Sequence, residues 1–151
     1  MRVTRFTDIG LRILMYLYQD RPDSPQVTVA EMAMQFATPA NHVVKVVGRL
    51  AKLGMVAATR GRNGGVKLAP AAASAGVGSL IRALEGEEGL IDCDGLQCRL
   101  RQHCRLRGAL QEGLTAFYTA MDRYTLADIA GGPTGQQIIH MHQQFLGATV
   151  R

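Results

Sequence analysis

Residues 28–68 constrain the fold more than any other stretch of this 151-residue chain, because they combine two short helical patterns with a glycine-rich hairpin. Thr28 and Glu31 have the spacing of a capping box, in which both side chains cap amides at a helix start. A second helix is expected over 39–53, and Gly54 is typical of the position just beyond a helix C-terminus. Two short helices joined by a tight turn favour a helix-turn-helix.

The second of these helices has two unlike faces. Its apolar positions are Val43, Val46, Val47, Leu50 and Leu53. Its opposite side carries Asn41, Lys45, Gly48 and Lys52, while His42, Val44 and Arg49 lie at the margins. Such a helix suits the major groove of DNA, where its first residues meet base edges. Thr38 is expected to cap the start of this helix. The candidate DNA contacts are Thr38, Asn41, His42, Lys45 and Arg49.

The hairpin after this helix completes the pattern. Residues 55–59 and 66–68 predict two strands, with a glycine-rich turn between them. Helix, helix, recognition helix and hairpin form the order of a winged helix-turn-helix. At the wing tip, Arg60, Arg62 and Asn63 are expected to meet phosphates or the minor groove. The formal net charge of +5 fits a polyanionic partner such as double-stranded DNA.

Two further helical patterns predict a homodimer. Over residues 8–19, one apolar stripe is formed by Ile9, Ile13, Tyr16 and Leu17, and a second by Leu11, Met15 and Tyr18. The second stripe is expected to meet another subunit. Over 106–121, apolar residues recur every three or four positions, and a seam of that length favours a dimer contact. The predicted fold is therefore mainly α: a winged helix-turn-helix domain with a two-stranded wing, plus a long C-terminal dimerisation helix.

The chain is expected to form three parts. Residues 1–70 form the predicted DNA-binding domain, 71–130 the cysteine-containing loop and dimerisation helix, and 131–151 a C-terminal tail. Glycines and a proline at 131–133 break the helical pattern, so the tail is expected to be weakly helical at best, with His140 and His142 at the surface. No run reaches membrane-spanning length and the N-terminus lacks a signal-peptide pattern, so a cytoplasmic protein is expected.

Every cysteine of the chain lies in the segment 91–107. Cys93, Cys98 and Cys104 have the spacing C-x4-C-x5-C, and an odd, clustered set argues against a disulfide framework. Arginines flank them at positions 99, 101, 105 and 107, and cationic surroundings favour the thiolates that bind soft metals. A metal centre is the preferred interpretation.

Other chemistries fit the cysteines less well. Zinc could use three cysteines and His103, but C-x2-C pairs are absent, and adjacent His103 and Cys104 are an awkward ligand pair. A metal-free thiol switch is a weaker alternative. A small iron-sulfur redox enzyme is another, but the sequence contains no nucleophile with a base, no substrate motif and no phosphate-binding loop, so no enzyme activity is expected.

Five motifs in this order resemble the winged-helix iron-sulfur repressors, and within that family the nitric-oxide-sensing type. They are NHVVKVV at 41–47, RGRNGG at 60–65, RALEG at 82–86, the three-cysteine loop, and YTLADI at 124–129. The resemblance covers residues 1 to about 130. It implies a homodimeric repressor that binds a palindromic operator and carries an iron-sulfur cluster, 4Fe-4S or alternatively 2Fe-2S. Nitrosylation of the cluster by nitric oxide would release the DNA.

The resemblance also implies a ligand set. In 4Fe-4S members of this type, an aspartate in the first helix of the other subunit is the fourth ligand, and Asp8 matches that position. From its position alone, Asp8 would be a first-turn acid paired with Arg12. The implied ligands are Cys93, Cys98, Cys104 and, from the other subunit, Asp8.

The alternative is an IscR-like regulator that senses cluster status through a 2Fe-2S centre. That type has a histidine ligand three residues after its last cysteine. This chain has Arg107 there, which counts against the alternative.

Overall fold

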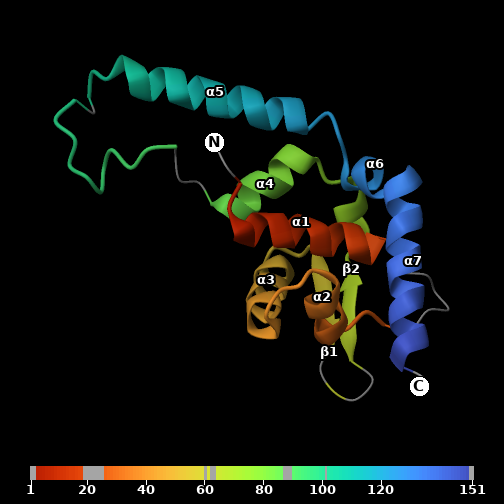
Figure 1. Cartoon of the computed structure of the whole chain (residues 1–151). Helices are drawn as coiled ribbons and strands as arrows, with labels where there is room; N and C mark the ends of the chain where they lie inside the picture. Colours follow the sequence, from red (N-terminus) through yellow and green to blue (C-terminus); the bar gives the residue numbers. More distant parts are fainter. Residues whose placement is uncertain are drawn as a thin grey trace.

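The structure is a computed structural model, and it describes residues 3–18, 26–59, 61, 64–86, 90–100 and 102–149. In chain order the elements are α1 (Arg5–Tyr18), α2 (Val29–Gln35), α3 (Ala40–Lys52), β1 (Val56–Thr59), β2 (Gly65–Leu68), the 3-10 helix η1 (Pro70–Ser74), α4 (Val77–Glu85), α5 (Arg105–Met121), α6 (Leu126–Ala130) and α7 (Gly132–Thr149). Figure 1 shows α1 through the middle of the molecule, with α2, α3 and the hairpin on one side and α4 and α5 on the other. None of the helices in the described ranges has the length and hydropathy to cross a membrane.

Local sequence signals account for the boundaries of the helix-turn-helix. The Thr28 hydroxyl accepts a hydrogen bond from the Glu31 amide at 3.2 Å, and this caps α2. At the other end, α3 stops before Gly54, whose φ of 70° is a conformation that glycine adopts readily. The predicted capping box is only half formed, because the Glu31 carboxylate turns into the core and binds Tyr16 instead.

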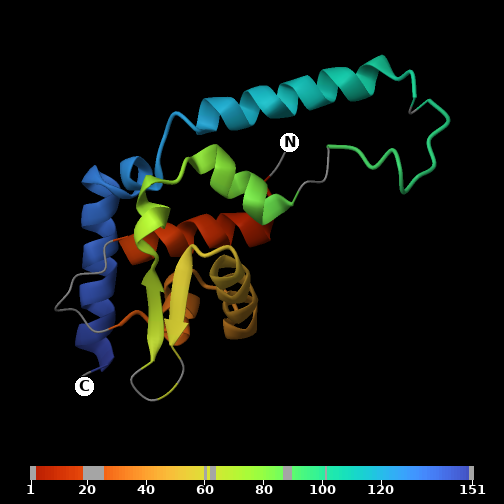
Figure 2. The same cartoon turned by 180° about the vertical axis from the view of Figure 1, so that it is seen from behind.

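One hydrophobic core joins the helix-turn-helix, the wing and the C-terminal helices. The buried residues Leu14 of α1, Leu50 of α3, Val66 of β2 and Leu126 of α6 all belong to it. The wing is an antiparallel pair in which Val56 is opposite Leu68, and Figure 2 shows it beside α3. The core therefore fixes the wing and α3 in one orientation.

The second apolar stripe of α1 is partly buried by the same chain, and its residues keep some exposed surface. Leu11 packs against a small cluster that includes Val77 and Ile81 of α4, and Met15 packs against the main core. Helix α1 thus contacts α3 on one side and α4, α6 and α7 elsewhere. The chain after the wing folds back over α1, and this supplies the second neighbour that two apolar stripes require.

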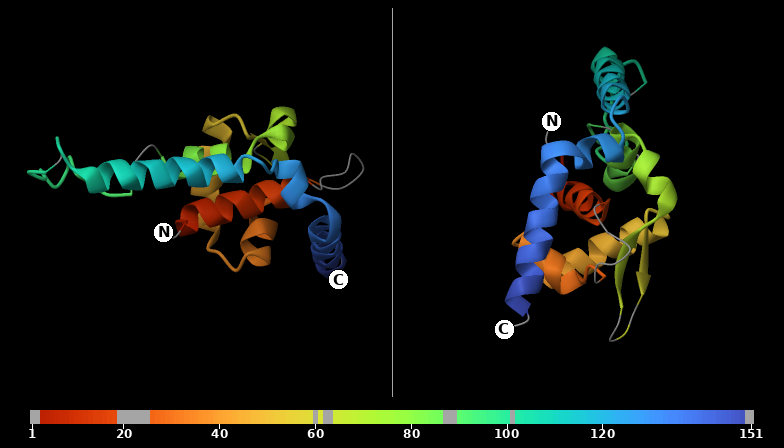
Figure 3. Two further views of the ribbon diagram at one scale, coloured as in Figure 1. Left: turned by 90° about the horizontal axis from the view of Figure 1, so that it is seen from above. Right: turned by 90° about the vertical axis from the view of Figure 1, so that its right-hand side faces the viewer.

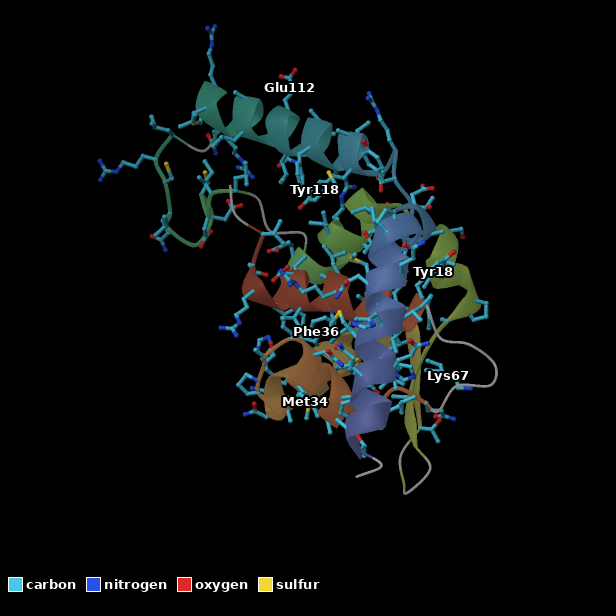
Figure 4. All side chains as sticks on the ribbon, turned by 45° about the vertical axis from the view of Figure 1, so that its right-hand side comes forward. Tyr18, Met34, Phe36, Lys67, Glu112 and Tyr118 are labelled. Atoms are coloured by element: carbon cyan, nitrogen blue, oxygen red, sulfur yellow. The ribbon has the colours of Figure 1, made fainter. Side chains whose placement is uncertain are left out.

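The apolar seam of α5 divides into two halves. Leu114 and Tyr118 are buried against α4, and Figure 4 shows Tyr118 directed towards the body and Glu112 away from it. By contrast, Leu106 near the start of α5 is 62% exposed. Figure 1 shows this end of α5 and the cysteine loop projecting beyond α4. The interpretation of the whole seam as a dimer contact was wrong for its second half, which packs inside the chain.

Residues after Gly131 form the 18-residue helix α7, which corrects the expectation of a weakly helical tail. Gly132, with φ of 56°, makes the turn between α6 and α7. Ile138 is 7% exposed in the main core, and Gln35 donates a hydrogen bond to the Met141 carbonyl at 2.9 Å. Figure 3 shows α7 lying across the end of α1. Tertiary packing stabilises this helix in spite of its glycines.

Candidate nucleic-acid interface and metal centre

Helix α3 presents one exposed face beside the wing. Its exposed residues include Asn41, Val44, Lys45, Gly48, Arg49 and Lys52, and its buried residues are Val43, Val46, Val47 and Leu50, in agreement with the predicted faces. Because β1 packs against α3, the helix and the wing belong to one surface. Winged helices place such a helix in the major groove and the wing on the flanking backbone.

Two of the predicted DNA contacts are not fully presented on this surface. Thr38 is 5% exposed, and its hydroxyl donates to the Phe36 carbonyl at 3.0 Å. The N-cap of α3 is Pro39, without a side-chain cap, so the capping prediction for Thr38 was wrong. His42 is half-buried against Phe6, with ring centroids 6.0 Å apart. Thr38 is thus bonded to the turn before α3, and His42 packs against α1.

The wing tip lies outside the described residues. Arg60, Arg62 and Asn63 fall there, so their contacts with phosphates or the minor groove stay predictions. The strands on either side of the tip are described, and Thr59 is opposite Gly65 at the end of the pairing.

The cysteine loop lies between α4 and α5. Cys93 is 8% exposed, Cys98 and Cys104 are half-buried, and all three are free thiols. The Cys98 amide donates to the Cys93 carbonyl at 3.1 Å, so these two residues belong to one turn. The Gly95 amide donates to the Asp92 carboxylate at 2.6 Å and tightens the same turn. Backbone hydrogen bonds thus hold two of the thiols in one compact segment.

Cys104 occupies the N-cap position of α5, and its side chain makes no capping hydrogen bond. Amides of the first helical turn favour negative charge at this end, which suits a thiolate. Nearby, Arg107 Nη2 lies 3.6 Å from Asp94 Oδ2 and links α5 to the loop. Position 107 therefore carries a cation that is paired with an acidic residue of the loop.

The three cysteines are of the residue type that holds iron-sulfur clusters. Among the described ranges, no three His, Cys, Asp or Glu side chains gather closely enough to hold a metal ion. Such clusters are held by cysteine thiolates with four ligands in all, so the three free thiols match the chemistry and lack one partner.

Asp8 is accessible on α1. It lines an open cavity of about 540 Å³ together with Val3, Arg5, Ile9, Arg12 and Phe36. Its carboxylate accepts a hydrogen bond from Arg12 Nε at 2.8 Å, and its side chain is 47% exposed. This is the pair expected from position alone. An exposed pair of this spacing contributes only about 0.3–0.5 kcal/mol, so another ligand of the carboxylate can replace Arg12 at little cost.

Helix α4, which precedes the cysteine loop, contacts the recognition helix α3. Arg49 donates from Nη2 to the Ala83 carbonyl at 2.9 Å, which ties α3 to the last turn of α4. Leu84 packs over Gly10 of α1, where an added Cβ would lie 2.9 Å from Leu84 Cδ1. Arg49, a candidate DNA contact, is thus engaged within the protein. A displacement of the end of α4 would reach α3 and α1 directly.

A buried network that the sequence reasoning missed joins α1, α2 and α7. Glu31 is 1% exposed, and its Oε1 accepts a hydrogen bond from the Tyr16 hydroxyl at 2.7 Å and lies 2.5 Å from His142 Nδ1. Burial, reinforced by the Glu31 carboxylate, raises the pKa of Tyr16 far above its ordinary range. The surface position expected for His142 was wrong, because its side chain is only 15% exposed. No local signal connects three residues so distant in sequence.

The fold and the exposed recognition helix define a winged-helix DNA-binding regulator. The sequence profile of the Rrf2 family, described as iron-dependent transcriptional regulators, matches residues 3–132, and the chain belongs to this family. It is 42% identical over 140 residues to the HTH-type transcriptional repressor NsrR of Streptomyces coelicolor. The aligned residues cover 92% of this chain and 95% of that protein. The predicted resemblance is confirmed. The chain is a DNA-binding transcriptional regulator and not an enzyme, and this similarity supports a repressor.

Solved structures share the fold. The oxidised form of Staphylococcus aureus CymR has a TM-score of 0.66 at 21% identity and covers 87% of this chain and 98% of its own. IscR of T. potens has a TM-score of 0.64 at 22% identity and covers 85% of each chain. At these identities the likeness concerns the fold alone, and it confirms the predicted fold class.

Proposed function

We propose that this chain is a homodimeric repressor that binds a palindromic operator and releases it when nitric oxide reacts with a bound iron-sulfur cluster. The similarity to NsrR over 92% of the chain carries the proposal. The three free cysteines in one loop support it, because they supply the donor chemistry that a cluster needs. A 4Fe-4S cluster is proposed, and a 2Fe-2S cluster is the alternative.

The proposed ligands are Cys93, Cys98, Cys104 and Asp8 of the second copy. Two observations support an intersubunit site. The projecting segment carries the exposed apolar residues Leu96, Leu100 and Leu106, which are 79%, 68% and 62% exposed and which a second copy would cover. The Asp8 carboxylate is half exposed in an open cavity, so a loop from another chain can reach it.

The proposed response uses side chains of both copies. When bound, the cluster supplies iron that reacts with nitric oxide. A carboxylate would hold iron less firmly than thiolates do, so Asp8 would be the ligand most easily displaced. The released carboxylate would then accept the hydrogen bond from Arg12 Nε that the structure shows at 2.8 Å. Without the link, the loop of one chain no longer fixes α1 of the other, and the two recognition helices lose the spacing that a palindrome requires.

The proposed DNA interface consists of α3 and the wing. Asn41 and Lys45 are exposed on α3 and are proposed to meet base edges, and Arg60, Arg62 and Asn63 are proposed to meet the backbone at the wing. Two copies carry twice the formal charge of +5, so affinity should fall steeply with salt. Arg49 is proposed to position α3 through Ala83 rather than to read bases.

The first test uses full-length protein purified without oxygen. Its visible spectrum and its iron and sulfide content identify the cluster, and an operator is selected from random DNA duplexes. Nitric oxide is then titrated while operator binding and the spectrum are recorded together. We expect loss of binding in step with loss of the cluster spectrum. Operator binding that survives complete reaction of the cluster would refute the sensing mechanism. Two irons and two sulfides per chain would favour the IscR-like alternative.

A second test addresses the intersubunit ligand. Asp8→Ala should make the cluster labile, whereas Arg12→Ala removes the same ion pair but keeps the carboxylate, and should retain the cluster. Mixed dimers of Asp8→Ala and Cys98→Ala chains contain one complete site if Asp8 binds across the interface and none if it binds within its own chain. We expect such dimers to hold about half the wild-type iron, as one of two sites predicts. Mixed dimers without iron would refute ligation across the interface.

A further inference from the structure

Val44 is an apolar residue on the DNA-facing side of α3. It is 55% exposed, although the residues next to it on the same face, Asn41 and Lys45, are polar. A β-branched side chain is not favoured in a helix by intrinsic propensity. Because most of its surface is open to solvent, packing within the chain gives little reason for valine at this position.

Gly48 lies one helical turn after Val44 and on the same exposed face. A Cβ built there would have no atom of another group within 4 Å, so no close contact inside the protein requires glycine. Its backbone is helical, and no unusual φ requires glycine either. Glycine costs helix stability at such a position, but it allows another molecule to approach the helix backbone closely.

We infer that Val44 and Gly48 together determine specificity for a thymine in each half-site, with the valine side chain on the thymine 5-methyl group and Gly48 allowing the helix to approach the groove. The inference rests on the proposed binding of operator DNA. The thymine methyl is the one apolar group that a base edge presents in the major groove, and apolar side chains read it by contact. Asn41, three residues before Val44, faces the same way and has the amide that pairs with adenine.

The test removes the methyl group and the side chain separately. In the selected operator, each thymine is replaced in turn by deoxyuridine, which lacks only that methyl. For the wild type, one symmetric pair of positions should lose affinity about fourfold per half-site, the effect of withdrawing one buried methyl group. Val44→Ala should bind the thymine and deoxyuridine operators equally well. Met34→Ala, which removes a 70% exposed apolar side chain from α2, should keep the wild-type difference.

Gly48→Ala tests the close approach. It should raise the melting midpoint by about 2–4 °C, since alanine favours the helix, and still weaken operator binding at least tenfold. Gly147→Ala, on α7, also places a Cβ in open space and should leave operator affinity unchanged. A stabilised Gly48→Ala protein with wild-type affinity would overturn this part of the inference.

The outcomes separate this inference from the proposed function. If the protein selects an operator but no thymine responds to loss of its methyl, or if Val44→Ala keeps the full wild-type response, DNA binding stands and the inference is wrong. If no sequence is selected under any cluster state, the proposed function fails, and the inference fails with it.

Discussion

Replacing His142 by alanine should weaken the docking of α7 and lower the free energy of unfolding by about 2 kcal/mol. His142 Nδ1 lies 2.5 Å from Glu31 Oε1, and the carboxylate is 1% exposed with the Tyr16 hydroxyl as its other partner. Hydrogen bonds to charged groups contribute about 1.5–3 kcal/mol, and complete loss of a buried pair costs about 3–5 kcal/mol. The range of about 1.5–3 kcal/mol applies, because the hydrogen bond from Tyr16 to Glu31 remains and water can enter at the 15% exposed His142 site.

The measurement is urea unfolding followed by circular dichroism, supported by thermal melts. At this size, about 2 kcal/mol corresponds to a midpoint lowered by roughly 4–8 °C. His140→Ala is the matched control, because His140 lies two residues away on the same helix, is exposed, and pairs only with Gln144 in the described part of the chain. That control should change stability by less than about 0.5 kcal/mol.

A double-mutant cycle decides whether the network is responsible. The effects of His142→Ala and Glu31→Gln should be non-additive by at least about 0.5 kcal/mol, because the two residues share one contact. If His142→Ala and His140→Ala change stability equally, or if the two network substitutions add, the assignment of α7 docking to this pair is wrong.

Three further predictions follow from single contacts. Burial raises the pKa of Tyr16 above its ordinary value of 10.0. The contribution of Tyr16 to stability is therefore present below pH 10.0 and is lost as pH rises beyond that value. Tyr16→Phe should remove this alkaline loss in unfolding measurements. Gly78→Ala would place a Cβ 2.1 Å from the Tyr118 carbonyl oxygen, so it should destabilise the protein by about 3 kcal/mol, while Gly113→Ala, in open space, should not. At the start of α6, the Thr125 amide donates a hydrogen bond to the Asp128 carboxylate at 2.8 Å, and this bond lowers the pKa of Asp128. The contribution of Asp128 to stability is therefore present above pH 3.8 and is lost as pH falls through the lowered pKa, and Asp128→Asn should flatten the stability curve there.

The sequence determined those features whose causes lie within a few residues. The Thr28 cap, Gly54 after α3 and the antiparallel wing each follow from local hydrogen-bonding and backbone preferences. The two faces of α3 follow from helical periodicity, since one buried side is enough to orient the helix. The residue type and spacing of the cysteines indicated a metal centre, but a shared site with Asp8 stays a proposal because it requires a second chain.

The tertiary structure decided those features whose partners are distant in sequence. Glu31 fits a capping box by spacing, yet its carboxylate binds Tyr16 and His142, because α7 folds back to cover it. Helix α4 packs against the second face of α1 and against the inner half of the α5 seam. Periodicity shows that a face will be buried, but apolar contact is non-directional, so it cannot name the neighbour. Only the three-dimensional path of the chain shows which apolar faces it buries. It also shows which faces stay exposed, at the start of α5 and on α3.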